Sequence, residues 1–335
     1  MGVKVVFFEI EPWEIDYLKE KLSGIEASFF EEALSLKNIE SARGCQVVST
    51  FTDSQINKEV LEKLPDLKLI TTRSTGFDHI DIETAKNLGI AVCSVPTYGE
   101  NTVAEHTFGL LLNLSRLIYK SIQSVKERGF IADGLRGFDL KGKTIGIVGT
   151  GHIGQHVARI ANGFEMNVIA FDVKQDKKLA KKLGFQYVTL EDLLKQSDII
   201  TLHVPYNKNT HHLINSGNIN LIKKGAYLIN TARGGIIETD ALVKALDSGI
   251  LAGAGLDVLE EECFIKEERQ ILTKDFPKTC DVKTMLENHV LMERGNVIIT
   301  PHNAFNSKEA LERILETTVE NIRGFEKKKV INKVN

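Results

Sequence analysis

Three polar side chains of different chemistry follow three apolar segments in the second half of the chain. Arg233 comes shortly after the segment that ends at Ile229, Glu262 comes after Leu256, and His302 comes after Ile299. A guanidinium can bind a carboxylate through two parallel hydrogen bonds, and imidazole is the usual proton donor near neutral pH. An adjacent carboxylate stabilises the protonated imidazole. The set therefore suits the reduction of a 2-keto acid, which presents a carboxylate to bind and a carbonyl oxygen to protonate.

Each of these residues also has an ordinary structural interpretation. Arg233 could form a surface ion pair, and His302 is one of nine histidines. Glu262 closes the run Glu260-Glu261-Glu262, and an acidic run is typical of a solvated surface. From the residues alone, the acid that would accompany the histidine stays open among these three glutamates.

A glycine-rich turn supplies the second chemical signal. Residues 149–154 read Gly-Thr-Gly-His-Ile-Gly, directly after the apolar segment 144–148 and at the start of an expected helix. In that context the pattern indicates a dinucleotide site. Gly149 permits the tight turn, Gly151 leaves room for a pyrophosphate, and Gly154 lets the helix pack on the strand. A purely structural glycine turn is the alternative.

Asp172 ends the next expected strand, 18 residues beyond Gly154. A carboxylate at that place accepts hydrogen bonds from the ribose hydroxyls of the adenosine and repels a 2′-phosphate. The pattern thus predicts NAD rather than NADP as the cofactor.

The elements that must position these residues alternate along the chain. In the first hundred residues, apolar segments alternate with helical ones, and this rhythm predicts a parallel sheet covered on both faces. A second series follows residue 140, and its near-continuous apolar strands suit another sheet buried on both faces. The expected strands are 3–8, 25–29, 45–49, 67–71, 90–93, 144–148, 167–171, 198–202, 226–229, 252–256 and 296–299, with helices over 12–22, 57–64 and 81–88 and others starting near 153, 176, 190 and 239.

Three further segments complete the expectation. Apolar residues recur at helical spacing from about 101 to 126 and predict one long helix with a single buried face. Residues 260–294 are charged and irregular, which suggests an insertion or a lid. An amphipathic helix is expected over about 307–327.

Composition excludes several classes of protein. The 335 residues carry 42 Lys and Arg against 45 Asp and Glu, a net charge of −3, which argues against a nucleic-acid or membrane-surface protein. No apolar run approaches the roughly 18 residues of a membrane span, and the N-terminus does not look like a secretory signal. The four cysteines form no CxxC, so we expect reduced thiols, a cytoplasmic location and no metal site.

At this point the chain resembles the D-2-hydroxyacid dehydrogenase family, and most closely its D-lactate dehydrogenase branch. The resemblance covers nearly the whole chain. It is carried by the glycine turn and by the segments 73–81 (RSTGFDHID), 95–106 (VPTYGENTVAEH), 230–235 (NTARGG), 255–258 (GLDV) and 300–305 (TPHNAF).

The resemblance implies two doubly wound parallel-sheet α/β domains. A Rossmann NAD-binding domain, residues 100–301, would be inserted into a flavodoxin-like substrate-binding domain made of residues 1–99 and 302–335, with the substrate in the cleft. The family usually forms homodimers through the cofactor domain, and the long helix would supply a hinge and part of that contact.

The resemblance also assigns the site residues. Arg233, Glu262 and His302 would form the catalytic set, and the choice of Glu262 rests on the family's spacing of five residues from Asp257. Cofactor contacts are implied for the turn and the strand ends, and substrate contacts for residues of both domains. The cofactor residues would be Gly149, Gly151, His152, Ile153, Gly154, Asp172, His203, Val204, Pro205, Thr231, Ala232, Arg233, Asp257 and His302, and the substrate residues Phe51, Thr75, Gly76, Tyr98, Arg233, His302 and Phe305.

Three aromatic rings, those of Phe51, Tyr98 and Phe305, would leave a small pocket that suits the methyl group of pyruvate. The leading hypothesis is therefore an NAD-dependent D-lactate dehydrogenase. Two alternatives stay open: a reductase for another 2-keto acid, such as hydroxypyruvate, glyoxylate or a branched-chain keto acid, and a non-catalytic protein that senses NADH on the same fold.

Overall fold

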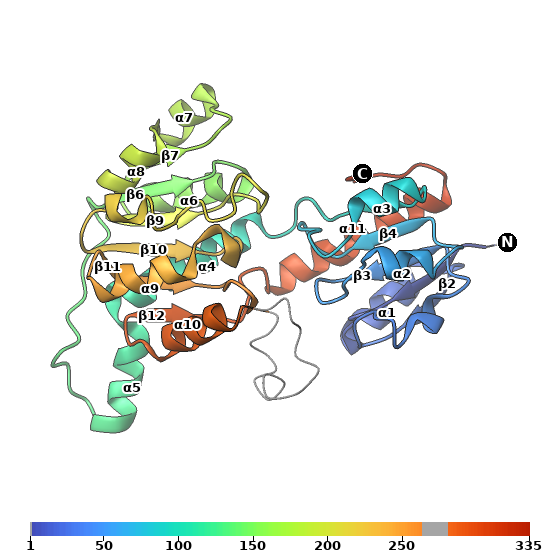
Figure 1. Ribbon diagram of the computed structural model, residues 1–335, viewed down its shortest axis with the longest axis horizontal. Coiled ribbons are helices and arrows are strands. Elements are labelled where there is room, and N and C mark those ends of the chain that lie inside the picture. Colours follow the sequence, from blue (N-terminus) through green and yellow to red (C-terminus); the bar gives the residue numbers. More distant parts are fainter. Residues whose placement is uncertain (1, 263–280) are drawn as a thin grey trace. The chain divides into compact units, whose positions relative to one another are not determined.

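The computed structural model describes residues 2–262 and 281–335, and its chain divides into two units (Figure 1). Unit 1 comprises Met1–Tyr98 together with Ser307–Asn335, and unit 2 comprises Gly99–Asn306. The chain thus leaves unit 1 once, builds unit 2 and returns to finish unit 1 with its last helix.

Unit 1 contains a five-stranded, fully parallel sheet with the strand order β2-β1-β3-β4-β5. That order is the flavodoxin-like one, in which the connections run to both sides of the first strand. Its elements are β1 (Lys4–Phe7), α1 (Pro12–Lys21), β2 (Glu26–Phe29), η1 (Ile39–Ala42), β3 (Val47–Thr50), α2 (Lys58–Glu62), β4 (Leu69–Thr72), α3 (Ile82–Asn87), β5 (Ala91–Cys93) and the C-terminal α11 (Lys308–Glu326).

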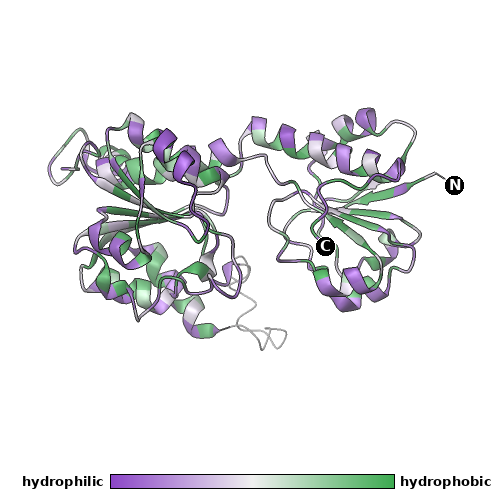
Figure 2. Ribbon diagram, turned by 90° about the horizontal axis from the view of Figure 1, so that it is seen from above, coloured by the Kyte–Doolittle hydropathy of each residue, from purple (hydrophilic) through white to green (hydrophobic). Residues whose placement is uncertain are grey.

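Both faces of this sheet are covered by helices. Alternate residues of β1 point to opposite faces, so Val6 packs in a core with α2 and α3, while Val5 and Phe7 pack in another with α1 and α11. In each unit the strands are mainly hydrophobic and lie between helices with hydrophilic outer faces (Figure 2). This double burial explains why the strands read as continuous apolar runs.

Unit 2 contains a seven-stranded parallel sheet with the order β12-β11-β10-β9-β6-β7-β8. Counted from β6, this is the 3-2-1-4-5-6 order of the Rossmann fold with one added strand. Its elements are α4 (Glu100–Arg116), α5 (Ile118–Arg128), β6 (Thr144–Val148), α6 (His152–Gly163), β7 (Asn167–Phe171), α7 (Lys177–Leu183), β8 (Gln186–Tyr187), α8 (Leu190–Gln196), β9 (Ile199–Leu202), η2 (Ile219–Leu221), β10 (Ala226–Asn230), η3 (Gly234–Ile236), α9 (Thr239–Asp247), β11 (Leu251–Leu256), α10 (Val282–Glu293) and β12 (Val297–Ile299).

Helices also cover both faces of the second sheet. Residues of α4 and α6 form one hydrophobic core with the strands, and residues of α8, α9 and α10 form the other. The fold class predicted from the sequence, two doubly wound parallel α/β sheets, is confirmed. The predicted strands are present within two residues at each end, and among the strands of the described residues the two-residue β8 alone was not predicted.

The prediction of one long helix over 101–126 is wrong. Leu117 adopts a left-handed conformation, with φ 52°, and separates α4 from α5. The chain returns to this point at Gly137, where a Cβ would lie 2.1 Å from the carbonyl oxygen of Ser115, and Phe138 donates its N–H to that oxygen. The carbonyl is therefore satisfied by a distant segment, which helical periodicity could not reveal.

The expected buried face also ends at this break. Residues of the pattern up to Leu114 are buried, whereas Ile118 and Ile122 are exposed. The helix α5 consequently carries an apolar stripe that no described residue of its own unit covers.

The segment 260–294, expected to be irregular, contains the helix α10. Asp281 caps its first turn by accepting the N–H of Lys283, and its buried residues pack beside α9 and β12. The prediction of a lid falls largely on residues 263–280, which lie outside the described residues.

Within the described residues, no helix is long and apolar enough to cross a bilayer. Cys45 and Cys93 carry free thiols, as expected. Cys263 and Cys280 lie outside the described residues.

Candidate active site

The predicted site residues of unit 2 follow adjacent strands at the carboxyl edge of its sheet. Asp172 follows β7, the glycine turn follows β6, and His203 follows β9. Arg233, Asp257 and His302 follow β10, β11 and β12 in the same order. Ligands of open parallel sheets bind along this edge, at the point where the strand order reverses, which here lies between β6 and β9.

Each glycine of the turn has a distinct structural reason. Gly149 has φ 97°, and a Cβ there would lie 2.6 Å from the His203 carbonyl oxygen. A Cβ on Gly154 would lie 2.0 Å from the Gly149 carbonyl oxygen. At Gly151 a Cβ would meet nothing within 4 Å. Two glycines thus close the turn, and the third borders open space.

That open space lies at the N-terminus of α6. Gly151 is the N-cap, and no side chain caps the first turn of the helix. The first backbone N–H groups of a helix, with the positive end of its dipole, suit the phosphates of a dinucleotide. The open space and the uncapped N–H groups are the features that a pyrophosphate site requires.

Asp172 is held at the rim of this turn. Its Oδ2 accepts the Thr150 N–H at 2.7 Å and the Thr150 hydroxyl at 3.0 Å, and its Oδ1 accepts the Lys174 N–H at 2.9 Å. Partial burial opposes ionisation, but these hydrogen bonds prevail and lower the pKa of Asp172 below its ordinary value. The residue thus presents a fixed, ionised carboxylate with lone pairs left for ribose hydroxyls.

His203 lies beside the glycine turn and is unsuited to donate a proton, because burial favours its neutral form. Burial lowers the pKa of His203 to about 3. Its Nε2 shares a hydrogen bond of 2.8 Å with the Thr201 hydroxyl, while its Nδ1 is buried with no hydrogen-bond partner. An unsatisfied buried nitrogen beside the glycine turn is a group that a ligand can satisfy.

The loops after β10, β11 and β12 are joined by main-chain hydrogen bonds. The Asp257 N–H donates to the Asn230 carbonyl at 2.9 Å, and the His302 N–H donates to the Asp257 carbonyl at 2.8 Å. The Asn230 amide donates to the Arg233 carbonyl at 2.9 Å. These bonds connect the loops that carry Arg233, Asp257 and His302 at one edge of the sheet.

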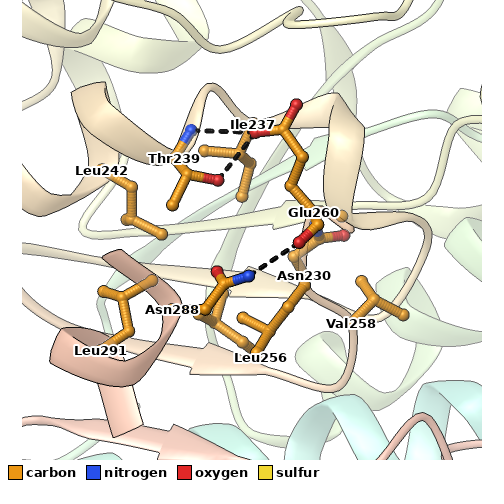
Figure 3. Close-up of a pocket in the computed structure, with 11 residues that line it drawn as sticks. Asn230, Ile237, Thr239, Leu242, Leu256, Val258, Glu260, Asn288 and Leu291 are labelled. Atoms are coloured by element: carbon orange, nitrogen blue, oxygen red, sulfur yellow. Dashed lines mark hydrogen bonds between the residues drawn. The ribbon is translucent and has the colours of Figure 1, made fainter. Parts of the chain in front are cut away.

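Gly234 brings two of these loops into direct contact. A Cβ there would lie 2.0–2.2 Å from backbone atoms of Leu259 and Glu260. Only glycine therefore allows the loop of Arg233 to pack against the segment that leads to Glu262. A small pocket beside this contact, lined mainly by apolar residues of α9, α10, β11 and the loops next to them, encloses at most about 210 Å³ (Figure 3). Typical small-molecule sites have roughly 300–1,000 Å³, and no member of the predicted catalytic set lines this one.

The structure separates the three glutamates that the residues alone left open. Glu262 Oε1 lies 2.5 Å from His302 Nδ1. Glu260 instead contacts His212 and Thr239, and Glu261 accepts the Asp281 N–H. Among the three, Glu262 alone is placed to orient His302, and each partner is 35% exposed, so solvent reaches the pair.

His302 owes its position to Asp257. The Asp257 carboxylate is 1% exposed and accepts the Thr300 hydroxyl at 2.5 Å and the backbone N–H groups of Asn303 and Ala304 at 3.0 and 2.9 Å. Burial opposes its ionisation, but hydrogen bonds from His106, Thr300, Ala304 and Asn303 prevail and lower the pKa of Asp257. The turn that carries His302 is therefore wrapped around a buried charge.

His106 is the supporting residue that the sequence analysis missed. It lies on α4, with Nε2 at 3.0 Å from the Thr300 hydroxyl and 3.4 Å from Asp257 Oδ1. It is 194 positions from Thr300 in the chain, and nothing in its local pattern signals this contact.

The predicted substrate residues are divided between the two units. Phe51, Thr75 and Tyr98 belong to unit 1, where they follow the adjacent strands β3, β4 and β5. Phe51 donates its N–H to Glu9, the Thr75 hydroxyl donates to the Val95 carbonyl, and Tyr98 accepts from Arg313. Gly76 lies in the Thr75 loop, where its carbonyl accepts the Ser74 hydroxyl.

Phe305 belongs to unit 2, as do Arg233 and His302. A Cβ on Gly99 would lie 4.0 Å from the Phe305 Cβ, so the Phe305 side chain leaves the backbone beside the first turn of α4. The substrate roles of these residues stay predictions.

Comparison with known proteins identifies the same architecture. The family model described as D-isomer specific 2-hydroxyacid dehydrogenase, NAD binding domain, matches residues 108–304. A D-lactate dehydrogenase of Escherichia coli is 35% identical over 97% of both chains. A glyoxylate reductase of Thermococcus litoralis is 36% identical over 97% of this chain and 90% of its own.

Among solved structures, a D-lactate dehydrogenase of Aquifex aeolicus, in complex with NAD and lactic acid, superposes with a TM-score of 0.87 at 38% identity. That match covers 97% of this chain and 96% of the other.

We predict that Asp257→Asn destabilises the protein by roughly 2–3 kcal/mol, because an amide would direct a donor at N–H groups that need an acceptor. Since folding lowers the pKa of Asp257, its stabilising effect is complete above the unfolded-state value of about 3.9 and disappears as pH falls through the lower folded-state value. Urea unfolding at pH 7 and at pH 3.5 should show a difference from wild type that shrinks in acid. The exposed Asp139→Asn is the control, and equal effects of both variants would contradict the role of Asp257.

Proposed function

The chain belongs to the D-isomer-specific 2-hydroxyacid dehydrogenase family, and on this premise we propose that it interconverts pyruvate and (R)-lactate. Membership makes it an oxidoreductase with NAD as its cofactor. The observation that carries the proposal is the pairing of His302 Nδ1 with Glu262 Oε1, on the sheet edge that also bears the glycine turn and Arg233.

His302 is the proposed acid–base residue. With the Nδ1 proton directed at Glu262, Nε2 is the nitrogen that gives its proton to the carbonyl oxygen during reduction and takes it back during oxidation. Glu262 stabilises the imidazolium and fixes the orientation of the ring. His203 is unsuited to this task, because burial keeps it neutral.

Arg233 is the proposed anchor for the substrate carboxylate. One of its N–H groups donates to the Ala232 carbonyl at 2.8 Å. A guanidinium has five N–H donors and can bind a carboxylate through two parallel hydrogen bonds. The substrate is thereby oriented with its carbonyl group toward the proton donor.

The cofactor residues are proposed along the same edge. The α6 N-terminus and Gly151 would hold the pyrophosphate, Asp172 the adenosine ribose, and the loops after β9, β10 and β11 the remainder. Bound NADH supplies the hydride that reduces the keto carbon. Of the predicted contacts, His152, Ile153 and Gly154 belong to the first turn of α6, Val204 and Pro205 follow His203, and Thr231 and Ala232 precede Arg233.

Pyruvate is proposed as the keto acid because three predicted pocket residues, Phe51, Tyr98 and Phe305, have large rings that would leave room for a methyl group. The similarity to D-lactate dehydrogenases supports this choice. The glyoxylate reductase relative is equally similar in sequence, so reduction of another small 2-keto acid is the second candidate.

A homodimer in the cytoplasm is also proposed. The face of α5 presents Ile118, Ile122 and Val125, each 42–50% exposed, at helical spacing. A second copy of the chain would bury this stripe through unit 2. A monomeric mass in light scattering at micromolar concentration would contradict the dimer.

A panel of 2-keto acids with NADH tests the reaction. We expect kcat/KM for pyruvate to exceed that for 2-ketoisocaproate, hydroxypyruvate and glyoxylate, and the product to be the (R) enantiomer. A higher value for another acid would move the assignment to that substrate. Absence of turnover with all of them, with NADH still bound, would favour the NADH-sensing alternative.

The proton donor is tested by pH profiles. Glu262→Gln removes the charge that stabilises the His302 imidazolium, so kcat/KM for reduction should decline at a lower pH than in wild type. His302→Gln should lower the rate by about 10²–10⁴-fold while NADH still binds. Glu261→Gln is the neighbouring control and should leave the profile in place. A Glu262→Gln profile that coincides with wild type would refute the pairing.

Cofactor choice is tested at Asp172. Asp172→Ala should lower kcat/KM with NADH by about 10–100-fold, because hydrogen bonds to a charged group are worth about 1.5–3 kcal/mol. The decrease in kcat/KM with NADPH should be smaller. Thr150→Val removes one hydroxyl contact but keeps the carboxylate and should preserve the preference for NADH. An unchanged NADH to NADPH ratio in Asp172→Ala would assign the preference to other residues.

A further inference from the structure

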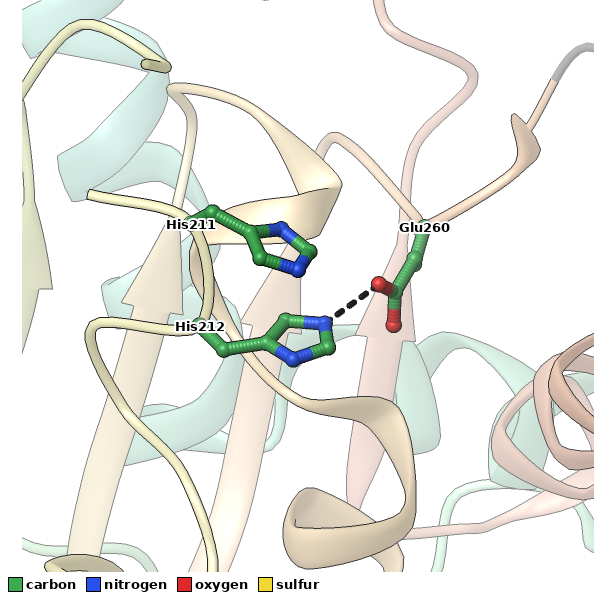
Figure 4. A group of neighbouring side chains, drawn as sticks. All are labelled: His211, His212 and Glu260. Atoms are coloured by element: carbon green, nitrogen blue, oxygen red, sulfur yellow. Dashed lines mark hydrogen bonds and ion pairs between the residues drawn. The ribbon is translucent and has the colours of Figure 1, made fainter. Parts of the chain in front are cut away.

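A second His–Glu cluster lies outside the proposed catalytic set. His211 and His212 lie in the loop that follows β9, and Glu260 lies after β11 (Figure 4). One nitrogen of each imidazole and one Glu260 oxygen all lie within 4.8 Å of one another. In Figure 4 the two rings are stacked and both present an edge toward the Glu260 carboxylate. The proposed reaction uses none of these three side chains.

The cluster is already oriented by its surroundings. Glu260 Oε2 accepts the Thr239 hydroxyl at 2.8 Å, which directs Oε1 toward His212 Nε2 at 2.6 Å. His211 Nδ1 lies 3.1 Å from the Tyr206 hydroxyl. Partners of this kind hold metal-binding histidines and carboxylates in position and select the nitrogen that binds the metal.

The backbone at His212 gives an independent indication. Its φ is 48°, a left-handed conformation that is uncommon for a residue with a side chain. The conformation is held by the His212 N–H, which donates to the Gly235 carbonyl at 2.8 Å. It directs the imidazole at Glu260 instead of along the loop, and such unfavourable conformations are concentrated at functional sites.

From this arrangement we propose that His211, His212 and Glu260 form a binding site for a divalent cation of the zinc type. Two imidazoles and one carboxylate are a ligand set that zinc uses, with water in the fourth position. Hard cations such as Mg²⁺ prefer sites made of oxygen ligands. The proposal goes beyond the predicted reaction and does not depend on it.

The distance between two of the ligand atoms can be compared with what a tetrahedral ion requires. With bonds of 2.0–2.1 Å, tetrahedral ligand atoms lie about 3.3 Å apart. The His212 nitrogen and the Glu260 oxygen, now 2.6 Å apart, would separate by about 0.7 Å to admit the ion. Side-chain rotations achieve such a change, because His211 is exposed and the other two are only partly buried.

Binding of the cation through His212 Nε2 requires the proton on that nitrogen to move. Without a metal, the His212 Nε2–H donates a hydrogen bond to Glu260 Oε1. The cation takes the Nε2 lone pair in its place, and the proton that leaves Nε2 is replaced by one taken from the solvent at Nδ1, so this change of tautomer releases no net proton. His211 binds through Nε2 when its Nδ1–H donates to the Tyr206 hydroxyl.

The cation would join three segments of unit 2: the loop after β9, the start of α9 through Thr239, and the segment after β11. Glu260 is two residues before Glu262, and its carbonyl accepts the Asn288 amide of α10 at 2.8 Å. Binding should therefore stabilise the segment that carries Glu262 and raise the thermal midpoint of unfolding.

The test uses the full chain, freed of metal with a chelator and titrated with ZnCl₂ by calorimetry. We expect one Zn²⁺ per chain, a higher thermal midpoint, and with Co²⁺ the strong visible absorption of a tetrahedral ion. His211→Asn, at an exposed position, should lower the zinc affinity by at least about 10-fold and abolish the thermal shift. Tyr206→Phe should weaken binding by about 10-fold, the lower end for loss of an orienting partner.

His156→Asn, which changes a histidine of α6 outside the cluster, is the matched control and should bind zinc as wild type does. Glu260→Gln should weaken binding if its circular dichroism shows an intact fold. Unchanged zinc affinity in both His211→Asn and Glu260→Gln would overturn the proposal. Loss of the ion in His302→Asn but not in His211→Asn would place it on the His302–Glu262 pair, and the proposal would then be wrong.

Discussion

The position of His302 depends on one buried carboxylate, that of Asp257. An ionised group that is 1% exposed is tolerated in a protein interior only if hydrogen bonds replace its water. The chain provides them by bending residues 300–304 around the carboxylate, and His302 takes a left-handed φ of 51° in that bend. The Asp257 N–H donates to the carbonyl of Asn230 at the end of β10, and the Asp257 carbonyl accepts the N–H of His302 after β12. The charge that must be satisfied thus sets both the turn and the direction of the imidazole.

In both units the predicted site residues follow strands of a parallel sheet and therefore lie at its carboxyl edge. In unit 2, the glycine turn, Arg233 and His302 follow β6, β10 and β12 of one sheet, and in unit 1 Phe51, Thr75 and Tyr98 follow the adjacent strands β3, β4 and β5. Parallel strands end at one edge, so residues far apart in sequence arrive there together. Helices cover both faces of each sheet, which leaves the strand ends as the place where polar side chains can gather.

The segment after β11 contains three consecutive glutamates, and two of them contact histidines. Glu261 has φ 56°, so the chain turns between Glu260 and Glu262, and the two carboxylates face different partners. Glu260 joins His212 and Thr239, whereas Glu262 joins His302. Gly234 makes this possible, since any side chain there would push the segment away from the Arg233 loop. A short acidic run that looks like a solvated surface is thus divided between two histidine partners.

The sequence by itself determined the features that depend on local pattern. Continuous apolar segments predicted the buried parallel strands, and the spacing of Gly149, Gly151 and Gly154 predicted the turn between β6 and α6, because a strand, a tight turn and a helix each impose their own periodicity. The tertiary structure decided what depends on distant partners. It split the expected long helix at Leu117, where Phe138 takes the Ser115 carbonyl. It also brought His106 to Thr300 and Asp257 and chose Glu262 over its two neighbours. Such contacts join residues up to 194 positions apart, and no local pattern encodes them, because only the packed sheets bring those residues together.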